Sequence, residues 1–249
     1  MKRIVCMIMA TIITISSTMI TDAEGINYKT CNGFRYNVDG KEINYYVGKK
    51  TTATIPAKIE GEKVRDVFLY KAPNLKKLKV SRYVKTIVVA RNKKLKKVTI
   101  DKRNKYITVS NNCILNKKKT KLLSVLGGYK EIRVPETVKV IDGTPFLGSN
   151  VSKIIITKNV KKVTFGAFSK CFKVKEIVFE GDKLPPNMEG WPSRNWGSKL
   201  ENSMKFYVKN ETLADKLLEK IDGKSDLYAK VYVGDKLVRE KQLNYNLNY

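Results

Sequence analysis

Histidine is absent from the 249 residues of this chain. The absence excludes Ser-His-Asp and Cys-His catalysis, HExxH zinc sites and His-ligated haem, because each of them needs an imidazole. Glycine-rich phosphate loops and closely spaced cysteine ligands are lacking as well. We therefore predict no cofactor and no metal site, and any enzyme chemistry would have to use carboxylates, lysines or tyrosines.

Acidic residues are scarce, with 23 Asp and Glu against 50 Lys and Arg, for a formal net charge of +27. Such a surface attracts polyanions in a salt-dependent way. No zinc finger, RNA-recognition signature or basic zipper accompanies the charge, so the sequence favours adhesion to acidic surfaces over specific nucleic-acid binding. The alternative is a lysine bias in composition with no functional meaning.

Only one long apolar run is present, IVCMIMATIITI at residues 4–15. It follows the basic start MKR and precedes a polar stretch that ends at Ala23, which is the pattern of a signal peptide. A membrane span would need about 20 apolar residues. We expect residues 1–23 to be removed and the protein to be secreted or extracellular, either free or associated with the cell surface, without a transmembrane span.

An internal repeat organises the remainder of the chain. Apolar residues recur with steps of 3, 8, 3 and 2 from Val64 to Val80, and the same steps return 20 residues later from Val84. The same pattern, with a longer second step, begins again at Val138 and at Val160. Each unit ends in an alternating apolar and polar stretch, which predicts a half-buried strand. One such coil cannot bury its own apolar face, so we predict a β-rich repeat solenoid with a ladder of parallel strands.

The unit VKKVTFGAFSKCFKVKEIVF at residues 160–179 resembles the BspA-like leucine-rich repeats of bacterial surface proteins. The unit before it matches well, with Pro145 where alanine is usual, whereas residues 64–80 and 84–100 lack the Ala-Phe pair. The resemblance covers roughly residues 34–208. It implies a leucine-rich-repeat superhelix in a secreted or surface protein that binds other proteins or matrix, and no enzyme activity.

Cysteines are few, and three remain beyond residue 23: Cys31, Cys113 and Cys171. An odd, sparse set is not a disulfide framework. Coils rise about 4.8 Å each, whereas bridged Cα atoms lie within roughly 7 Å. We place Cys31 at the N-terminal end, Cys113 in a strand–turn–strand insertion, and Cys171 in the last complete coil as a small inward hydrophobe, and we expect no disulfide.

The expected boundaries of the caps and the repeat region follow from turn and helix patterns in the sequence. Residues 24–55 are assigned to an N-terminal β-hairpin cap around Asp39-Gly40, and residues 56–208 to the repeats. An inserted strand–turn–strand excursion is expected at about residues 101–133. Residues 209–249 are predicted to form a C-terminal cap, with a helix at residues 211–221 after Asn210 and a hairpin at Gly234-Asp235. The alternative is a small appended module.

Two sets of residues are candidate binding sites. Outward strand positions predict a lysine ladder across three coils, formed by Lys77, Lys79, Lys97 and Lys153; its alternative is a solvated face that discourages aggregation. Trp191 and Trp196 lie in the loop EGWPSRNWGS, where they could stack on sugars or anchor a partner protein. The alternative is that they cover the end of the solenoid.

These features predict a non-catalytic binding or adhesion scaffold whose partner is an extracellular protein, matrix or an anionic cell-surface polymer. One alternative is a polysaccharide-active enzyme or its accessory carbohydrate-binding module; a second is a non-specific electrostatic binder of polyanions. A glycosidase would need two carboxylates within about 10 Å in one cleft. The spacing of Asp66, Glu131, Glu136, Asp142 and Glu176 places no such pair.

Overall fold

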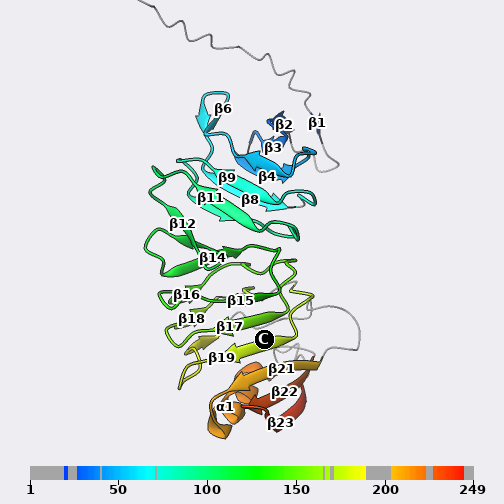
Figure 1. Ribbon diagram of the computed structural model, residues 1–249, viewed down its shortest axis with the longest axis vertical. Coiled ribbons are helices and arrows are strands. Elements are labelled where there is room, and N and C mark those ends of the chain that lie inside the picture. Colours follow the sequence, from blue (N-terminus) through cyan, green and yellow to red (C-terminus); the bar gives the residue numbers. More distant parts are fainter. Residues whose placement is uncertain are drawn as a thin grey trace, which may run out of the picture.

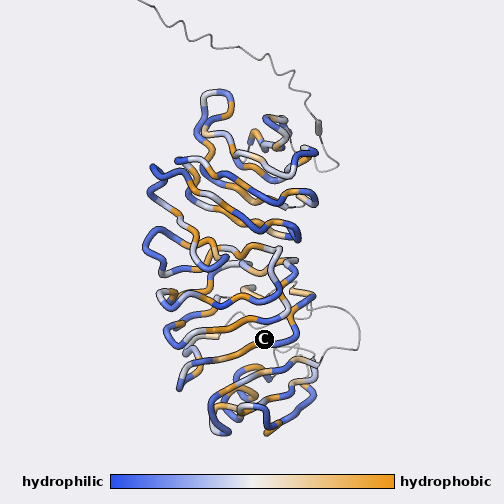
Figure 2. Tube along the Cα trace, in the orientation of Figure 1, coloured by the Kyte–Doolittle hydropathy of each residue, from blue (hydrophilic) through white to orange (hydrophobic). Residues whose placement is uncertain are grey.

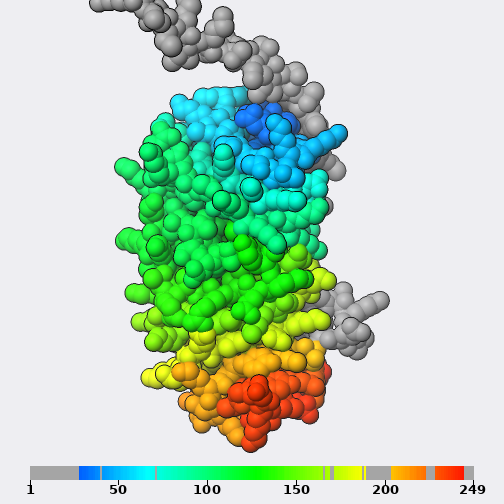
Figure 3. Space-filling view, viewed as in Figure 1, coloured from blue at the N-terminus to red at the C-terminus, as the bar shows by residue number. Residues whose placement is uncertain are grey.

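The computed structural model describes residues 20–21, 27–39, 41–70, 72–164, 166–168, 171–188, 203–222 and 227–243. They form an elongated solenoid whose coils stack along the long axis in the order of the sequence (Figures 1 and 3). The predicted signal peptide, apart from Ile20–Thr21, lies outside the described residues, and so do Trp191 and Trp196.

One side of the solenoid carries two ladders of parallel strands. The first ladder consists of β5 (Thr52–Thr54), β9 (Lys77–Val80) and β11 (Lys97–Ile100). The second ladder contains β15 (Glu131–Arg133), β17 (Lys153–Ile156), β19 (Glu176–Phe179) and β21 (Ser203–Val208). The predicted parallel-strand solenoid is thus confirmed.

Short strands form the opposite wall of the coils (Figure 1). In the N-terminal half they are β4 (Glu42–Tyr46), β8 (Asp66–Tyr70) and β10 (Thr86–Val88). Farther along they are β14 (Lys121–Val125), β16 (Val140–Ile141), β18 (Lys162–Val163) and β20 (Asn187–Met188). The repeat positions Val64, Leu75, Val138 and Val163 are fully buried in the coil interiors. Hydrophobic and hydrophilic residues alternate along the coils as this burial requires (Figure 2).

Antiparallel strands begin the described chain. The strands β1 (Ile20–Thr21), β2 (Asn27–Cys31) and β3 (Phe34–Asn37) pair in succession, and β3 forms a hairpin with β4. The strand β4 then pairs in parallel with β8 and so joins the hairpin to the coils. A small hairpin, β6 (Lys58–Ile59) with β7 (Glu62–Lys63), turns at Gly61, whose φ of 85° favours glycine.

An antiparallel excursion separates the two ladders. The strands β12 (Ile107–Ser110) and β13 (Cys113–Asn116) form a hairpin, and β13 pairs antiparallel with β14. The next strand, β15, pairs in parallel with β17. Residues 131–133, at the end of the stretch expected as the excursion, therefore belong to a coil of the solenoid.

The C-terminal segment continues the second ladder. Asn210 caps the helix α1 (Glu211–Ile221), because its Oδ1 accepts a hydrogen bond of 2.9 Å from the backbone N–H of Leu213. The strand β22 (Leu227–Val233) pairs in parallel with β21, and β23 (Lys236–Leu243) closes a hairpin with β22. Among the described residues no helix has the length and apolar character needed to cross a membrane.

Candidate functional site

The first ladder presents a basic face, defined here by Lys77, Lys79 and Lys97. These side chains are exposed, and Lys77 lies in register with Lys97 on the neighbouring strand. The other outward positions of β5 and β11 are threonines, and the three strands contain no acidic residue. The face therefore presents positive charge without a negative partner in its own strands.

Buried and exposed residues alternate along each strand, and this alternation fixes the orientation of the basic face. Leu78 and Val98, which alternate with the lysines, are buried and fix the strands to the coil interior. Neighbouring parallel strands lie about 4.8 Å apart, so Lys77 and Lys97 start from nearby backbone positions. Like charges in register disfavour the isolated protein, and an anionic partner would relieve their repulsion.

The first acidic residue after β11 is already engaged. Asp101 forms an ion pair of 2.8 Å with Arg103, and the hydrogen bonds from Arg103 hold the pKa of Asp101 at about 2. Because this carboxylate is bound to its own arginine, it leaves the positive charge of the basic face largely unneutralised.

The sequence places Lys153 in the same ladder, and this expectation is wrong. Lys153 lies on β17 in the second ladder, in register with Glu131 on one side and Glu176 on the other. Its Nζ atom is 3.5 Å from the Oε2 of Glu131. The excursion ends the first ladder at β11, and the coil that follows contributes Glu131, so Lys153 sits in a column of alternating charge.

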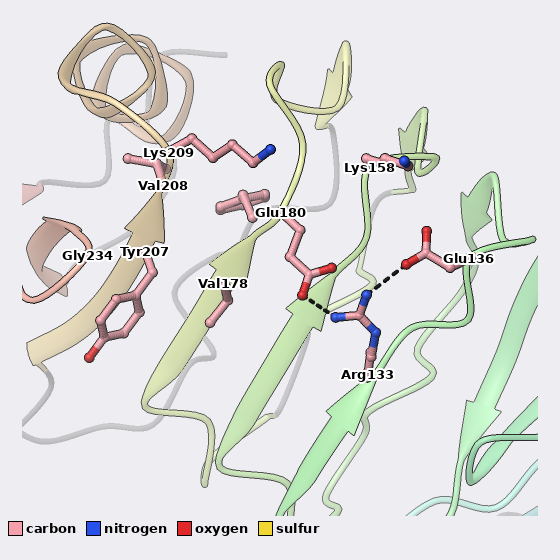
Figure 4. A pocket seen from close by; sticks show the side chains of 10 residues that line it. Arg133, Glu136, Lys158, Val178, Glu180, Tyr207, Val208, Lys209 and Gly234 are labelled. Atoms are coloured by element: carbon pink, nitrogen blue, oxygen red, sulfur yellow. Dashed lines mark hydrogen bonds and ion pairs between the residues drawn. The ribbon is translucent and has the colours of Figure 1, made fainter.

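A second candidate site is an open surface pocket of about 570 Å³ in the C-terminal half, here called the C-terminal pocket (Figure 4). Arg133 lies between Glu136 and Glu180 and donates hydrogen bonds to both carboxylates, at 2.7 Å to Glu136. Val178 and Tyr207 contribute an apolar wall from adjacent strands. Lys158 and Lys209 add cations, and Lys209 is ion-paired with Asp182 at 2.8 Å.

A row of outward apolar and aromatic side chains crosses the strands of the second ladder beside this pocket. Its members share outward positions in register on neighbouring strands: Ile155, Val178, Tyr207 and Tyr232. The rings of Tyr207 and Tyr232 are stacked, with centroids 5.2 Å apart and planes inclined by 23°. Burial raises the pKa of Tyr207, and the nearby Glu176 adds to the shift.

Sequence reasoning missed the C-terminal pocket. Arg133 and Glu180 are 47 residues apart in the chain, and the stacking of coils brings them together. The alternation of β19 and β21 would have placed Val178 and Tyr207 outward, but spacing alone gave no reason to pair them. The predicted tryptophan site lies outside the described residues.

This geometry defines a leucine-rich-repeat type of β-solenoid. The family "BspA type Leucine rich repeat region (6 copies)" matches residues 126–185 of this chain. The match to residues 126–185 agrees with the resemblance on which the sequence analysis relied. No curated protein shows a significant match to the chain.

Solved bacterial structures are also similar to it. A leucine-rich repeat protein from Eubacterium ventriosum is 18% identical, covers 68% of this chain and 49% of its own, and has a TM-score of 0.39. A leucine rich cell surface protein from Faecalibacterium prausnitzii is 16% identical, with 74% and 64% covered and a TM-score of 0.31. The pneumococcal vaccine antigen PcpA is 12% identical, with 87% and 98% covered and a TM-score of 0.29. The present chain thus spans about half of the Eubacterium ventriosum chain.

Proposed function

We propose that this protein is a secreted or cell-surface-associated, non-catalytic scaffold whose basic face binds an anionic partner. The partner is an acidic protein, a matrix component or an anionic cell-surface polymer. The observation that carries the proposal is the register of Lys77 with Lys97 on a face whose strands contain no acidic residue.

The distribution of charge supports this assignment. Residues 49–105 contain 19 Lys and Arg but four Asp and Glu. Such a concentration raises the local density of anions and speeds their association. The signal-peptide pattern of residues 1–23 and the BspA-type repeats support a location outside the cell.

The C-terminal pocket does contain two neighbouring carboxylates, Glu136 and Glu180, but its geometry favours binding over glycoside hydrolysis. Both are held by Arg133, whose guanidinium lies between them (Figure 4). A glycosidase needs room between its two carboxylates for a glycosidic bond or a water, and here the arginine occupies that space.

The proposal is tested by reversing Lys77, Lys79 and Lys97 to Glu and measuring binding to dextran sulfate over a range of salt concentrations. The matched control reverses Lys173, Lys175 and Lys216, three exposed lysines outside the first ladder, and changes the net charge equally. We expect the first variant to lose most of its affinity and to show a flatter salt dependence, while the control retains both. Equal losses in the two variants would mean that only net charge matters.

A further inference from the structure

The second ladder differs in character from the first. Its four strands carry three Lys and Arg and two Glu, whereas the three strands of the first ladder carry three Lys and no acidic residue. The charged groups around the C-terminal pocket are largely paired, Arg133 with Glu136 and Glu180, and Lys209 with Asp182. A polyanion gains little net attraction there.

The same pairs leave hydrogen-bonding capacity of both kinds at the pocket. Carboxylate oxygens accept, and the ammonium groups of Lys158 and Lys209 donate. A ligand that matches this lining has groups that both donate and accept and carries no net charge. Sugar hydroxyls have this property.

The tyrosines provide the apolar part of the site. Tyr232 covers one face of the Tyr207 ring, at a centroid distance of 5.2 Å. On the other side of β21, Val178 of β19 lies in register with Tyr207, and both side chains line the pocket (Figure 4). Stacking on Tyr232 fixes the orientation of the Tyr207 ring, which reduces the entropy lost when a ligand packs against the ring.

From these features we infer that the C-terminal pocket binds an uncharged oligosaccharide, with the C–H face of one sugar ring packed on Tyr207. Its hydroxyls bond to the carboxylates of Glu136 and Glu180 and to Lys158. The volume of about 570 Å³ falls in the range of roughly 300–1,000 Å³ typical of small-ligand sites. This site is separate from the basic face and does not depend on the function proposed for it.

The test is calorimetric titration of the full secreted chain with neutral hexasaccharides of glucose (α- and β-linked), mannose and N-acetylglucosamine, at low and high salt. We expect at least one to bind, with an affinity that salt leaves unchanged. Tyr207→Ala should weaken it at least about tenfold, as removal of a central aromatic contact does. Tyr207→Phe should retain binding, and so should Tyr106→Ala, which removes an exposed tyrosine far from the pocket.

Circular dichroism establishes that each variant is folded. If Tyr207→Ala does not fold, Val178→Glu, which puts a charge on the outward wall of the pocket, replaces it with the same expected loss. Binding of none of the hexasaccharides would overturn the inference. So would unchanged affinity in the Tyr207 or Val178 variant, or binding only to a sulfated oligosaccharide or a peptide.

Discussion

The side chain of Asn92 joins its coil to the preceding one through the backbone of Leu69. Its Nδ2 atom donates a hydrogen bond of 2.8 Å to the carbonyl of Leu69, and its Oδ1 atom accepts one of 2.5 Å from the N–H of Ala72. Asn92 is fully buried. The amide therefore satisfies two backbone groups that water cannot reach.

We predict that Asn92→Ala lowers the free energy of unfolding by about 2–4 kcal/mol, because two buried polar groups lose their partners. Urea denaturation followed by circular dichroism measures the change. Asn74→Ala is the control, since Asn74 is exposed and accepts only a 3.5 Å bond from Lys94. A loss from Asn92→Ala no larger than that of the control would contradict this role.

The two ladders should respond oppositely to charge reversal. Lys153→Glu places a third glutamate in register between Glu131 and Glu176, and we expect the free energy of unfolding to fall by about 1 kcal/mol, and by less at high salt. Lys97→Glu places a glutamate beside Lys77 and should be neutral or slightly stabilising. Thermal unfolding at two salt concentrations distinguishes them, and equal effects would contradict the separation of the ladders.

Burial raises the pKa of the Cys113 thiol from its ordinary value of 9.0 to about 12. The folded state therefore keeps a proton that the unfolded chain releases, and stability from this group is present below pH 9 and is lost as pH rises towards 12. We predict that the unfolding free energy of the wild type falls more steeply over this range than that of Cys113→Val. Parallel curves for the two proteins would contradict the prediction.

The reactivity of the cysteines offers a separate check. Cys113 and Cys171 are buried, burial raises the pKa of both thiols, and the structure places Cys31, Cys113 and Cys171 outside any disulfide. We expect both buried thiols to resist a thiol reagent at pH 8 in the folded protein. In denaturant without reductant, a chain that lacks residues 1–23 should show three reactive thiols; fewer would indicate a disulfide.

The periodicity of apolar residues was sufficient to predict the coils, because burial dictates the phase of each strand. Leu75, Leu78 and Val80 are all buried as their spacing requires. The helix at residues 211–221 was predictable for the same reason, with Asn210 as its cap. These are local relationships within one coil or one turn.

Relationships between coils were not predictable in the same way. The spacing of apolar residues is alike in the coils of both ladders. It therefore did not reveal that the excursion interrupts the first ladder before Lys153. The strand Glu131–Arg133 was assigned to the excursion because it follows the excursion directly in the sequence. The meeting of Arg133 with Glu180 depends on which coils are adjacent, which is a property of the stack and not of a single repeat.

The most direct test of the basic face is lysine acetylation measured by mass spectrometry, with and without bound dextran sulfate. Lys77, Lys79 and Lys97 are exposed, as are Lys173 and Lys216, so all five should react in the unbound protein. The account predicts that the polymer protects the first three lysines and leaves the other two as reactive as before. Uniform protection of all five, or protection confined to Lys173 and Lys216, would contradict it.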